Sequence, residues 1–112
     1  MEVVENLNEG IVILTIKGDI DLHHSPKLRT LLRSKASAKC PALLVSFLEV
    51  NYIDSSGIAT LVEYFQSCRT FTGKIALFGM NARVKSVFEL VRLNEVFSIF
   101  ATNEEAHLHL KK

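Results

Sequence analysis

The sequence has 112 residues, of which 48% are hydrophobic and 22% charged, enough apolar material for one hydrophobic core. Its 13 basic residues nearly balance its 12 acidic ones, and a formal charge of +1 disfavours direct binding to nucleic acid or to an anionic membrane surface. No run approaches the roughly 18 apolar residues of a membrane span, and the first residues lack the basic region of a signal peptide. We therefore expect a single domain over residues 1–112, located in the cytoplasm.

Two strand patterns open the chain. A weak strand begins at Val3, a β-branched run covers residues 11–16, and the turn residues 8–10 between them predict a β-hairpin. Three further strands are expected over the apolar runs 42–48, 75–78 and 96–100.

Helical spacing of apolar residues alternates with these later strands. Ser25 and Pro26 predict the start of the first helix, because serine caps a helix and proline fits its first turn. The second helix follows Gly57, the third has Asn81 as its expected cap, and a capping-box pattern at 102–105 opens the fourth. This order predicts an α/β domain with a mixed, mostly parallel β-sheet, an N-terminal β-hairpin and about four α-helices. The basic residues of the first helix are expected on a solvated side: Lys27, Arg29, Arg33 and Lys35.

The densest polar cluster is Asp54-Ser55-Ser56-Gly57, at a junction between a strand and a helix. Functional groups gather at such junctions, because the strand fixes their position and the helix N-terminus offers unpaired N–H groups. One interpretation is a helix cap, with Gly57 easing the turn. The other is a hydroxyl accessible to another protein, because a cap needs one acceptor while this junction supplies three, followed by a glycine that leaves the backbone unshielded. Phosphorylation there would add a charge of about −1.5 to −2.

Three blocks together resemble a known family. Residues 52–58 (Tyr-Ile-Asp-Ser-Ser-Gly-Ile), with 18–21 (Gly-Asp-Ile-Asp) upstream and 84–90 plus Leu93 downstream, are similar to the STAS domain of bacterial anti-sigma factor antagonists. The resemblance covers essentially the whole chain in order and spacing. It implies a STAS-like fold and a non-enzymatic switch. The unmodified protein would bind an anti-sigma factor, often itself a GHKL-type serine kinase, and so free a sigma factor, until phosphorylation ends the binding.

The resemblance also implies roles for individual residues. The family's acceptor is the serine directly after the aspartate, which falls on Ser55, while helix geometry alone does not choose between Ser55 and Ser56. Asp21 matches the family's acidic residue near the switch surface. The kinase would supply ATP and magnesium, and a metal-dependent serine phosphatase would restore the hydroxyl, so no cofactor is expected in the chain itself. The expected partner-binding residues are Asp21, His24, Ser25, Asp54, Ser55, Ser56, Gly57 and Ile58.

Two positions depart from the family pattern. Ser46 stands where many relatives have Asp or Asn, and Ala59 stands where glycine is frequent after the switch motif. Neither touches the acceptor in the expected arrangement, but Ala59 is placed to alter the fit of a partner.

Metal binding has little support in the sequence. Consecutive residues such as His23 and His24 project differently, and no cysteine or carboxylate cluster completes a coordination set near them. His107 and His109 would diverge by roughly 200° on a helix. The two cysteines, Cys40 and Cys68, form no CxxC pair and are expected to be free thiols.

Two other functions remain as alternatives. STAS domains also serve in transporters, so a freestanding STAS subunit of a lipid or ABC transport complex keeps the fold and changes the role. A small serine hydrolase is the remote alternative, because Ser55 or Ser56 can be drawn with a histidine and Asp21 as a triad. The sequence lacks the Gly-x-Ser-x-Gly elbow, and 112 residues leave little room for a substrate pocket.

Overall fold

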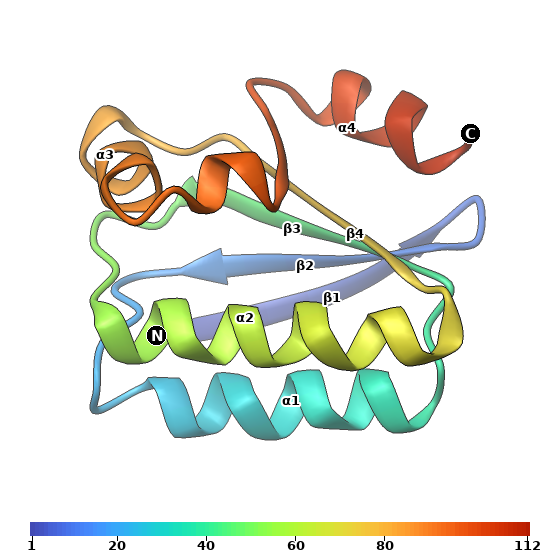
Figure 1. The fold of residues 1–112 in the computed structure, drawn as a ribbon, viewed down its shortest axis with the longest axis horizontal. Coiled ribbons are helices and arrows are strands. Elements are labelled where there is room, and N and C mark those ends of the chain that lie inside the picture. Colours follow the sequence, from blue (N-terminus) through green and yellow to red (C-terminus); the bar gives the residue numbers. More distant parts are fainter.

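The computed structural model describes residues 1–112 and contains a five-stranded sheet in the order β1-β2-β3-β4-β5 (Figure 1). β1 pairs antiparallel with β2, and all other neighbouring strands pair in parallel. The mixed, mostly parallel sheet with an N-terminal hairpin is therefore confirmed. The strands are β1 Glu2–Asn8, β2 Ile11–Lys17, β3 Ala42–Glu49, β4 Lys74–Phe78 and β5 Ser98–Phe100.

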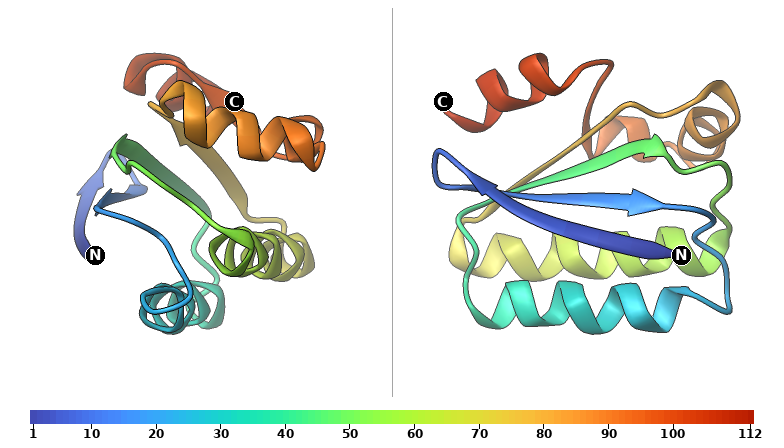
Figure 2. Two further views of the ribbon diagram at one scale, coloured as in Figure 1. Left: turned by 90° about the vertical axis from the view of Figure 1, so that its left-hand side faces the viewer. Right: turned by 180° about the vertical axis from the view of Figure 1, so that it is seen from behind.

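Four helices surround the sheet. The pair α1 and α2 lies side by side on one face, and α4 lies on the other (Figure 2). The helix α3 lies beyond the carboxyl ends of the strands, at the left of Figure 1. No helix has both the length and the apolar character that a membrane crossing requires. The helices are α1 Ser25–Ser37, α2 Ser55–Cys68, α3 Ala82–Leu90 and α4 Asn103–Leu110, with short 3-10 turns η1 Arg69–Phe71 and η2 Leu93–Glu95.

The hairpin turn consists of two residues in the left-handed region. Glu9 has a φ of 53° and Gly10 a φ of 80°, between the paired residues Asn8 and Ile11. Positive φ at both central positions is the signature of a type I′ turn, whose twist matches that of the flanking strands. The predicted hairpin forms because glycine takes the second of these positions without steric cost.

The central strand β3 is buried on both faces, as its continuous apolar run predicts. Leu43, Val45 and Phe47 belong to the larger core of 19 buried residues, which contains the apolar residues of α1 and α2. Ala42 and Leu44 belong to a smaller cluster of 7 buried residues, which includes residues of α4. The sheet is thus anchored mainly through its α1 and α2 face.

The start of α1 differs from the prediction. The helix begins at Ser25 with Pro26 in its first turn, but the cap position is His24 and Ser25 is 2% exposed. Asp21 supplies the hydrogen-bond acceptors at the start of α1 instead. Its carboxylate accepts a hydrogen bond from the backbone N–H of His24 at 3.0 Å, and its backbone carbonyl accepts one from the N–H of Ser25 at 2.8 Å. Ser25 is therefore a buried helix residue and not a cap.

The basic side of α1 is not simply solvated, contrary to expectation. Arg29 and Arg33 both pair with Glu63 of α2, at 3.1 Å and 2.7 Å. Lys35 pairs with Glu5 of β1 at 2.6 Å. These side chains link α1 to its neighbours, although ion pairs that water still reaches contribute little stability individually.

Candidate functional site at the start of α2

The loops that follow β2 and β3 are joined by backbone hydrogen bonds. Ile20 donates to the carbonyl of Tyr52 at 2.9 Å, and Asp54 donates to the carbonyl of Ile20 at 3.2 Å. An isolated parallel bridge pairs Ile20 with Ile53. The two motif blocks that the sequence singles out, around Asp21 and around Asp54, therefore meet at one edge of the sheet.

Asp54 caps α2 and ties the two loops together. Its Oδ1 accepts from the backbone N–H groups of Ser56 at 2.9 Å and Gly57 at 3.2 Å, and from the Ser56 hydroxyl at 2.6 Å. Its Oδ2 accepts from the backbone N–H of Leu22 at 3.0 Å. The hydrogen bond from the Ser56 hydroxyl and then those from the backbone amides outweigh desolvation and lower the pKa of Asp54. The carboxylate is thus ionised at neutral pH.

The two serines differ in their surroundings. Ser55 is the first residue of α2, is exposed, and its hydroxyl has no hydrogen-bond partner in the chain. Ser56 is half-buried, and its hydroxyl donates to Asp54. The structure thereby distinguishes the hydroxyls of Ser55 and Ser56, between which helix geometry alone does not choose.

Gly57 has a different role from the predicted one. A Cβ built on Gly57 would lie 2.7 Å from Ile20 Cγ2, 2.8 Å from the Ile20 carbonyl oxygen and 2.8 Å from Ile53 Cγ1. The residue is buried, so it does not leave the backbone unshielded, and its φ is not in the left-handed region. Glycine is needed here because only a hydrogen atom fits where α2 meets the paired loops.

Asp21 and His24 form a second bonded pair at the same edge. Asp21 Oδ1 lies 2.8 Å from His24 Nδ1. Burial opposes the ionisation of Asp21, but the backbone and side-chain hydrogen bonds from His24 outweigh it and lower its pKa. Both side chains are half-buried, as is Ile58 in the first turn of α2, whereas Ser25 is enclosed.

Two exposed apolar side chains flank this edge and were not among the predicted site residues. Leu22 is 75% exposed and Tyr52 is 42% exposed. The backbone of Leu22 bonds to Asp54, and the carbonyl of Tyr52 bonds to Ile20. Leu22 could have been found as an apolar residue between the polar Asp21 and His23, but Tyr52 is followed by the apolar Ile53, so its sequence context does not mark it as exposed. We define the switch surface as Asp21, Leu22, His24, Tyr52, Asp54, Ser55, Ser56 and Ile58.

The two positions that depart from the expected pattern, Ala59 and Ser46, lie in different surroundings. Ala59 is exposed on the first turns of α2, next to Ile58 of the switch surface. Ser46 is 3% exposed within β3. Of these two positions only Ala59 is therefore accessible at the surface.

No group of three or more His, Cys, Asp or Glu side chains is arranged to hold a metal ion. Cys40 and Cys68 are free thiols, as predicted, and burial raises the pKa of both. No hydrogen bond joins Ser55 or Ser56 to a histidine, so the triad of the hydrolase alternative is not assembled.

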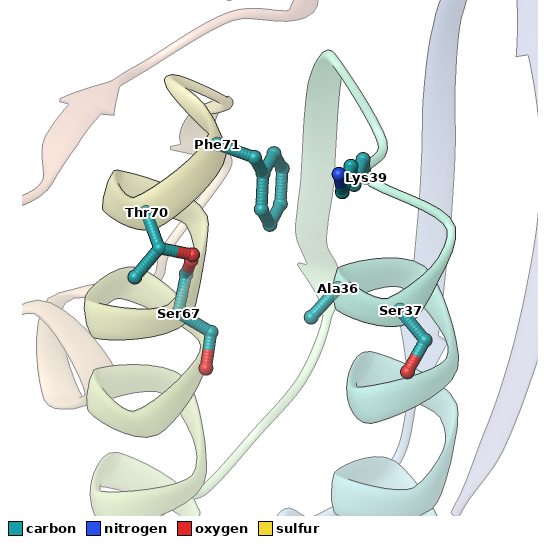
Figure 3. Close-up of a pocket in the computed structure, with 6 residues that line it drawn as sticks. All are labelled: Ala36, Ser37, Lys39, Ser67, Thr70 and Phe71. Atoms are coloured by element: carbon teal, nitrogen blue, oxygen red, sulfur yellow. The ribbon is translucent and has the colours of Figure 1, made fainter.

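The largest hollow of the molecule lies at the other ends of α1 and α2 (Figure 3). Its volume is about 720 Å³. It is broad and open, and none of its residues belongs to the switch surface. Its lining residues are Ala36, Ser37, Lys39, Ser67, Thr70 and Phe71.

Comparison with known sequences identifies relatives over nearly the whole chain. The profile of the STAS domain family matches residues 3–106. The anti-sigma-B factor antagonist of Listeria monocytogenes is 29% identical over 99 residues, covering 88% of this chain and 86% of that protein. The corresponding antagonist of Bacillus subtilis is 28% identical over 97 residues, covering 87% and 88%.

Comparison with solved structures gives the same fold. A putative anti-sigma factor antagonist from Thermotoga maritima superposes with a TM-score of 0.93 at 19% identity, covering 98% of this chain and 95% of that one. The Bacillus antagonist SpoIIAA is also similar, in two states. Its unphosphorylated form has a TM-score of 0.75 at 17% identity, covering 98% of both chains. Its phosphorylated form has a TM-score of 0.76 at 18% identity, covering 97% and 99%.

Proposed function

The chain belongs to the STAS domain family, and on that premise we propose that it is an anti-sigma factor antagonist whose binding is switched off by phosphorylation of Ser55. Relatives named anti-sigma-B factor antagonists, aligned over most of their length, support the first part. The protein acts as a ligand and substrate of other proteins, not as an enzyme, and it acts in the cytoplasm, where sigma factors work. Its partner is an anti-sigma factor that is also a GHKL-type serine kinase.

The observation that carries the second part is the free hydroxyl of Ser55. It is exposed at the start of α2, while the hydroxyl beside it is bonded to Asp54. In the proposed reaction Ser55 Oγ attacks the γ-phosphorus of Mg²⁺·ATP held by the kinase. A new oxygen–phosphorus bond forms as the bond to ADP breaks, and the hydroxyl proton passes to a base of the kinase. A metal-dependent serine phosphatase later hydrolyses the ester.

The charge of the site supports a switch by repulsion. Asp21 and Asp54 are already ionised there, and a phosphate adds about −1.5 to −2. On a chain of formal charge +1, this reverses the net charge and concentrates the change at one edge. A partner docked over Leu22 and Tyr52 would then have to desolvate a cluster of like charges, which costs several kcal/mol if it is not neutralised.

The same fold accommodates both states in a relative. SpoIIAA in its unphosphorylated and phosphorylated forms has nearly equal likeness to this chain, with TM-scores of 0.75 and 0.76. The positive end of a helix dipole also tolerates an anionic group at its first residue. Both points support the proposal that a phosphate on Ser55 changes the surface of this chain without unfolding it.

The proposal is tested with the purified kinase, Mg²⁺·ATP and mass spectrometry, which should find phosphate on Ser55. In calorimetric titrations, Ser55→Ala should bind the anti-sigma factor as wild type does, and Ser55→Asp should bind about tenfold more weakly or worse. Ser34→Asp adds the same charge at an exposed position of α1 and should leave the affinity unchanged.

Equal affinities of Ser55→Ala and Ser55→Asp would show that charge at this serine is not the signal. A pull-down from native lysate adds an independent measurement. Stable co-purification with an ATPase and membrane subunits, without an anti-sigma factor, would favour the transport-complex alternative instead.

A further inference from the structure

The junction at α2 presents two adjacent serines, and the kinase has to distinguish them. We propose that Asp54 is the specificity-determining residue for phosphorylation. Its carboxylate holds the hydroxyl of Ser56 in a hydrogen bond and leaves the hydroxyl of Ser55 as the acceptor of the phosphoryl group. This inference rests on the proposed function and adds to it the residue that selects the site.

The first support is the set of hydrogen bonds that the carboxylate accepts. Asp54 accepts hydrogen bonds from four donors: the Ser56 hydroxyl and the backbone N–H groups of Leu22, Ser56 and Gly57. Three of these donors share Oδ1, including the Ser56 hydroxyl, and the fourth bonds to Oδ2. Ser55 makes no hydrogen bond to either oxygen, so its hydroxyl is free to rotate toward a partner while that of Ser56 is held.

The second support is what transfer to Ser56 would require. Its oxygen lies 2.6 Å from Asp54 Oδ1, so the anionic γ-phosphoryl group would have to approach within contact of a carboxylate. The short charge-assisted hydrogen bond would have to break first. For Ser55 neither requirement applies, because its hydroxyl makes no such bond.

The third support is the fixed backbone of the first turn. Thr60 is 1% exposed and donates its hydroxyl to the carbonyl of Ser56 at 2.9 Å. Gly57 is wedged against Ile20 and Ile53, where not even a methyl group fits. These contacts hold the backbone of the turn in place, so a backbone shift does not carry the half-buried Ser56 outward. Its hydroxyl becomes available only when the hydrogen bond to Asp54 breaks.

The opposite role for the same contact is general-base activation of Ser56, since a carboxylate hydrogen-bonded to a hydroxyl can accept its proton. The multiple donors to Asp54 make it a weak base, because they lower its pKa. The two roles predict opposite effects of removing the carboxylate. If Asp54 holds back the Ser56 hydroxyl, its removal should raise the rate of phosphoryl transfer to Ser56. If Asp54 activates that hydroxyl as a base, its removal should lower the rate.

The test is made in a Ser55→Ala background with the GHKL-type kinase that phosphorylates the wild-type chain, Mg²⁺·ATP, and quantitative mass spectrometry of the 52–58 peptide. Ser55→Ala alone should receive almost no phosphate. Adding Asp54→Ala should raise the rate of transfer to Ser56 by about tenfold or more, the factor expected when a hydrogen bond to a charged group no longer has to break.

Two further variants serve as controls. Asp54→Asn keeps a carbonyl oxygen that accepts from the Ser56 hydroxyl but removes the negative charge, so its gain of transfer to Ser56 should be smaller than that of Asp54→Ala. Asp19→Ala removes an exposed carboxylate from the neighbouring loop and should open no new site. Thermal unfolding of all variants, followed by circular dichroism, measures any loss of stability. A loss of stability does not by itself create a new phosphorylation site.

Each outcome separates the inference from the function on which it rests. Phosphate on Ser55 of the wild type, with no gain at Ser56 in the double variant, overturns the inference and leaves the proposed function standing. Phosphate on Ser56 that depends on an intact Asp54 overturns it in favour of activation. A wild-type chain that receives phosphate on neither serine contradicts the proposed function, and the inference with it.

Discussion

The two ends of α2 differ in what they offer to a partner. At the N-terminal end, hydrogen bonds join two loops and a helix cap, and a free hydroxyl and two apolar side chains remain on the surface. At the C-terminal end, a hollow of about 720 Å³ opens between α1 and the 3-10 turn η1 (Figure 3). The largest hollow therefore lies at the end of α2 that is remote from the two motif blocks, whereas the end that carries these blocks presents its polar and apolar groups on the surface.

The two ends of α2 differ because the chain follows a different path at each of them. Near Ser55, the chain enters α2 from paired loops, so neighbouring segments approach closely and fill the space. At the opposite end, α1 and η1 are each followed by a residue in the left-handed region, Lys39 with a φ of 54° and Thr72 with a φ of 57°. The chain turns away there, and the helices are left with a gap between them.

The largest expected effect tests the close packing at the N-terminal end. Gly57→Ala should destabilise the protein by about 3 kcal/mol, the upper end of the range for overpacking, because the added methyl group meets a backbone carbonyl and two buried isoleucines. Urea unfolding followed by circular dichroism measures the loss.

Gly73→Ala is the matched control at the other end. Its methyl group would meet Phe71 Cε2 at 2.5 Å and the Cys40 carbonyl oxygen at 3.0 Å. The Phe71 ring is half-buried and can move, so the loss should be clearly smaller than at Gly57. A loss of equal size at both glycines would break the contrast between a filled end and an open one.

The next largest effect concerns the exposed apolar side chain of Leu22 and the affinity for the anti-sigma factor. Leu22→Ala should weaken binding to the anti-sigma factor by about tenfold, the effect of removing one central apolar contact. Leu7 in β1 is 72% exposed, nearly the same as the 75% of Leu22, but it precedes the hairpin turn. Leu7→Ala should bind as wild type in the same calorimetric titration. Equal losses would mean that the partner does not recognise the N-terminal end of α2 in particular.

The sequence predicted those parts of the molecule whose causes are local. The hairpin follows from Gly10, the buried strand β3 from an uninterrupted apolar run, and the cap of α4 from Thr102 and Glu105, which form the predicted capping box. Asp54 was likewise recognisable as a cap, because the acceptor and the amides it bonds lie within three residues of each other.

Contacts between distant segments were not predictable in this way. Nothing in the residues around Ser25 shows that Asp21 and not the serine would bond the start of α1. The need for Gly57 depends on Ile20, which lies in another loop. The bond from Leu22 to Asp54 joins the same two loops. The switch surface is therefore a tertiary feature, of which the sequence reveals only the separate blocks.

A smaller effect tests the charge of the cap. Asp54→Ala should cost about 1 kcal/mol at pH 7. The pKa of Asp54 is lowered from 3.8 in the folded protein, so its stabilising contribution is complete above that ordinary value and is lost as pH falls through the folded pKa. The difference between wild type and variant should therefore shrink below about pH 4.

Asn81 provides the neutral control for this pH dependence. Its side-chain oxygen caps α3 by accepting from the N–H of Val84 at 2.8 Å, and an amide does not titrate. Asn81→Ala should cost a similar amount at every pH between 7 and 3. Unfolding midpoints in urea across this range measure both series, and a loss at Asp54 that does not vary with pH would contradict a role for its charge.

The smallest effect tests the open end of α2, where no function is expected. Lys39 follows α1 in the left-handed region, with its N–H bonded to the carbonyl of Ala36 and that of Cys40 bonded to Lys35, the pattern of a Schellman motif. A side chain costs roughly 1–2 kcal/mol in that region, and the greater flexibility of glycine in the unfolded chain offsets roughly 0.5–1 kcal/mol. Lys39→Gly should therefore stabilise the protein by about 0.5–1 kcal/mol. Lys39→Ala removes the same charge but keeps the strain, so it should give no gain, and neither variant should change the affinity for the anti-sigma factor.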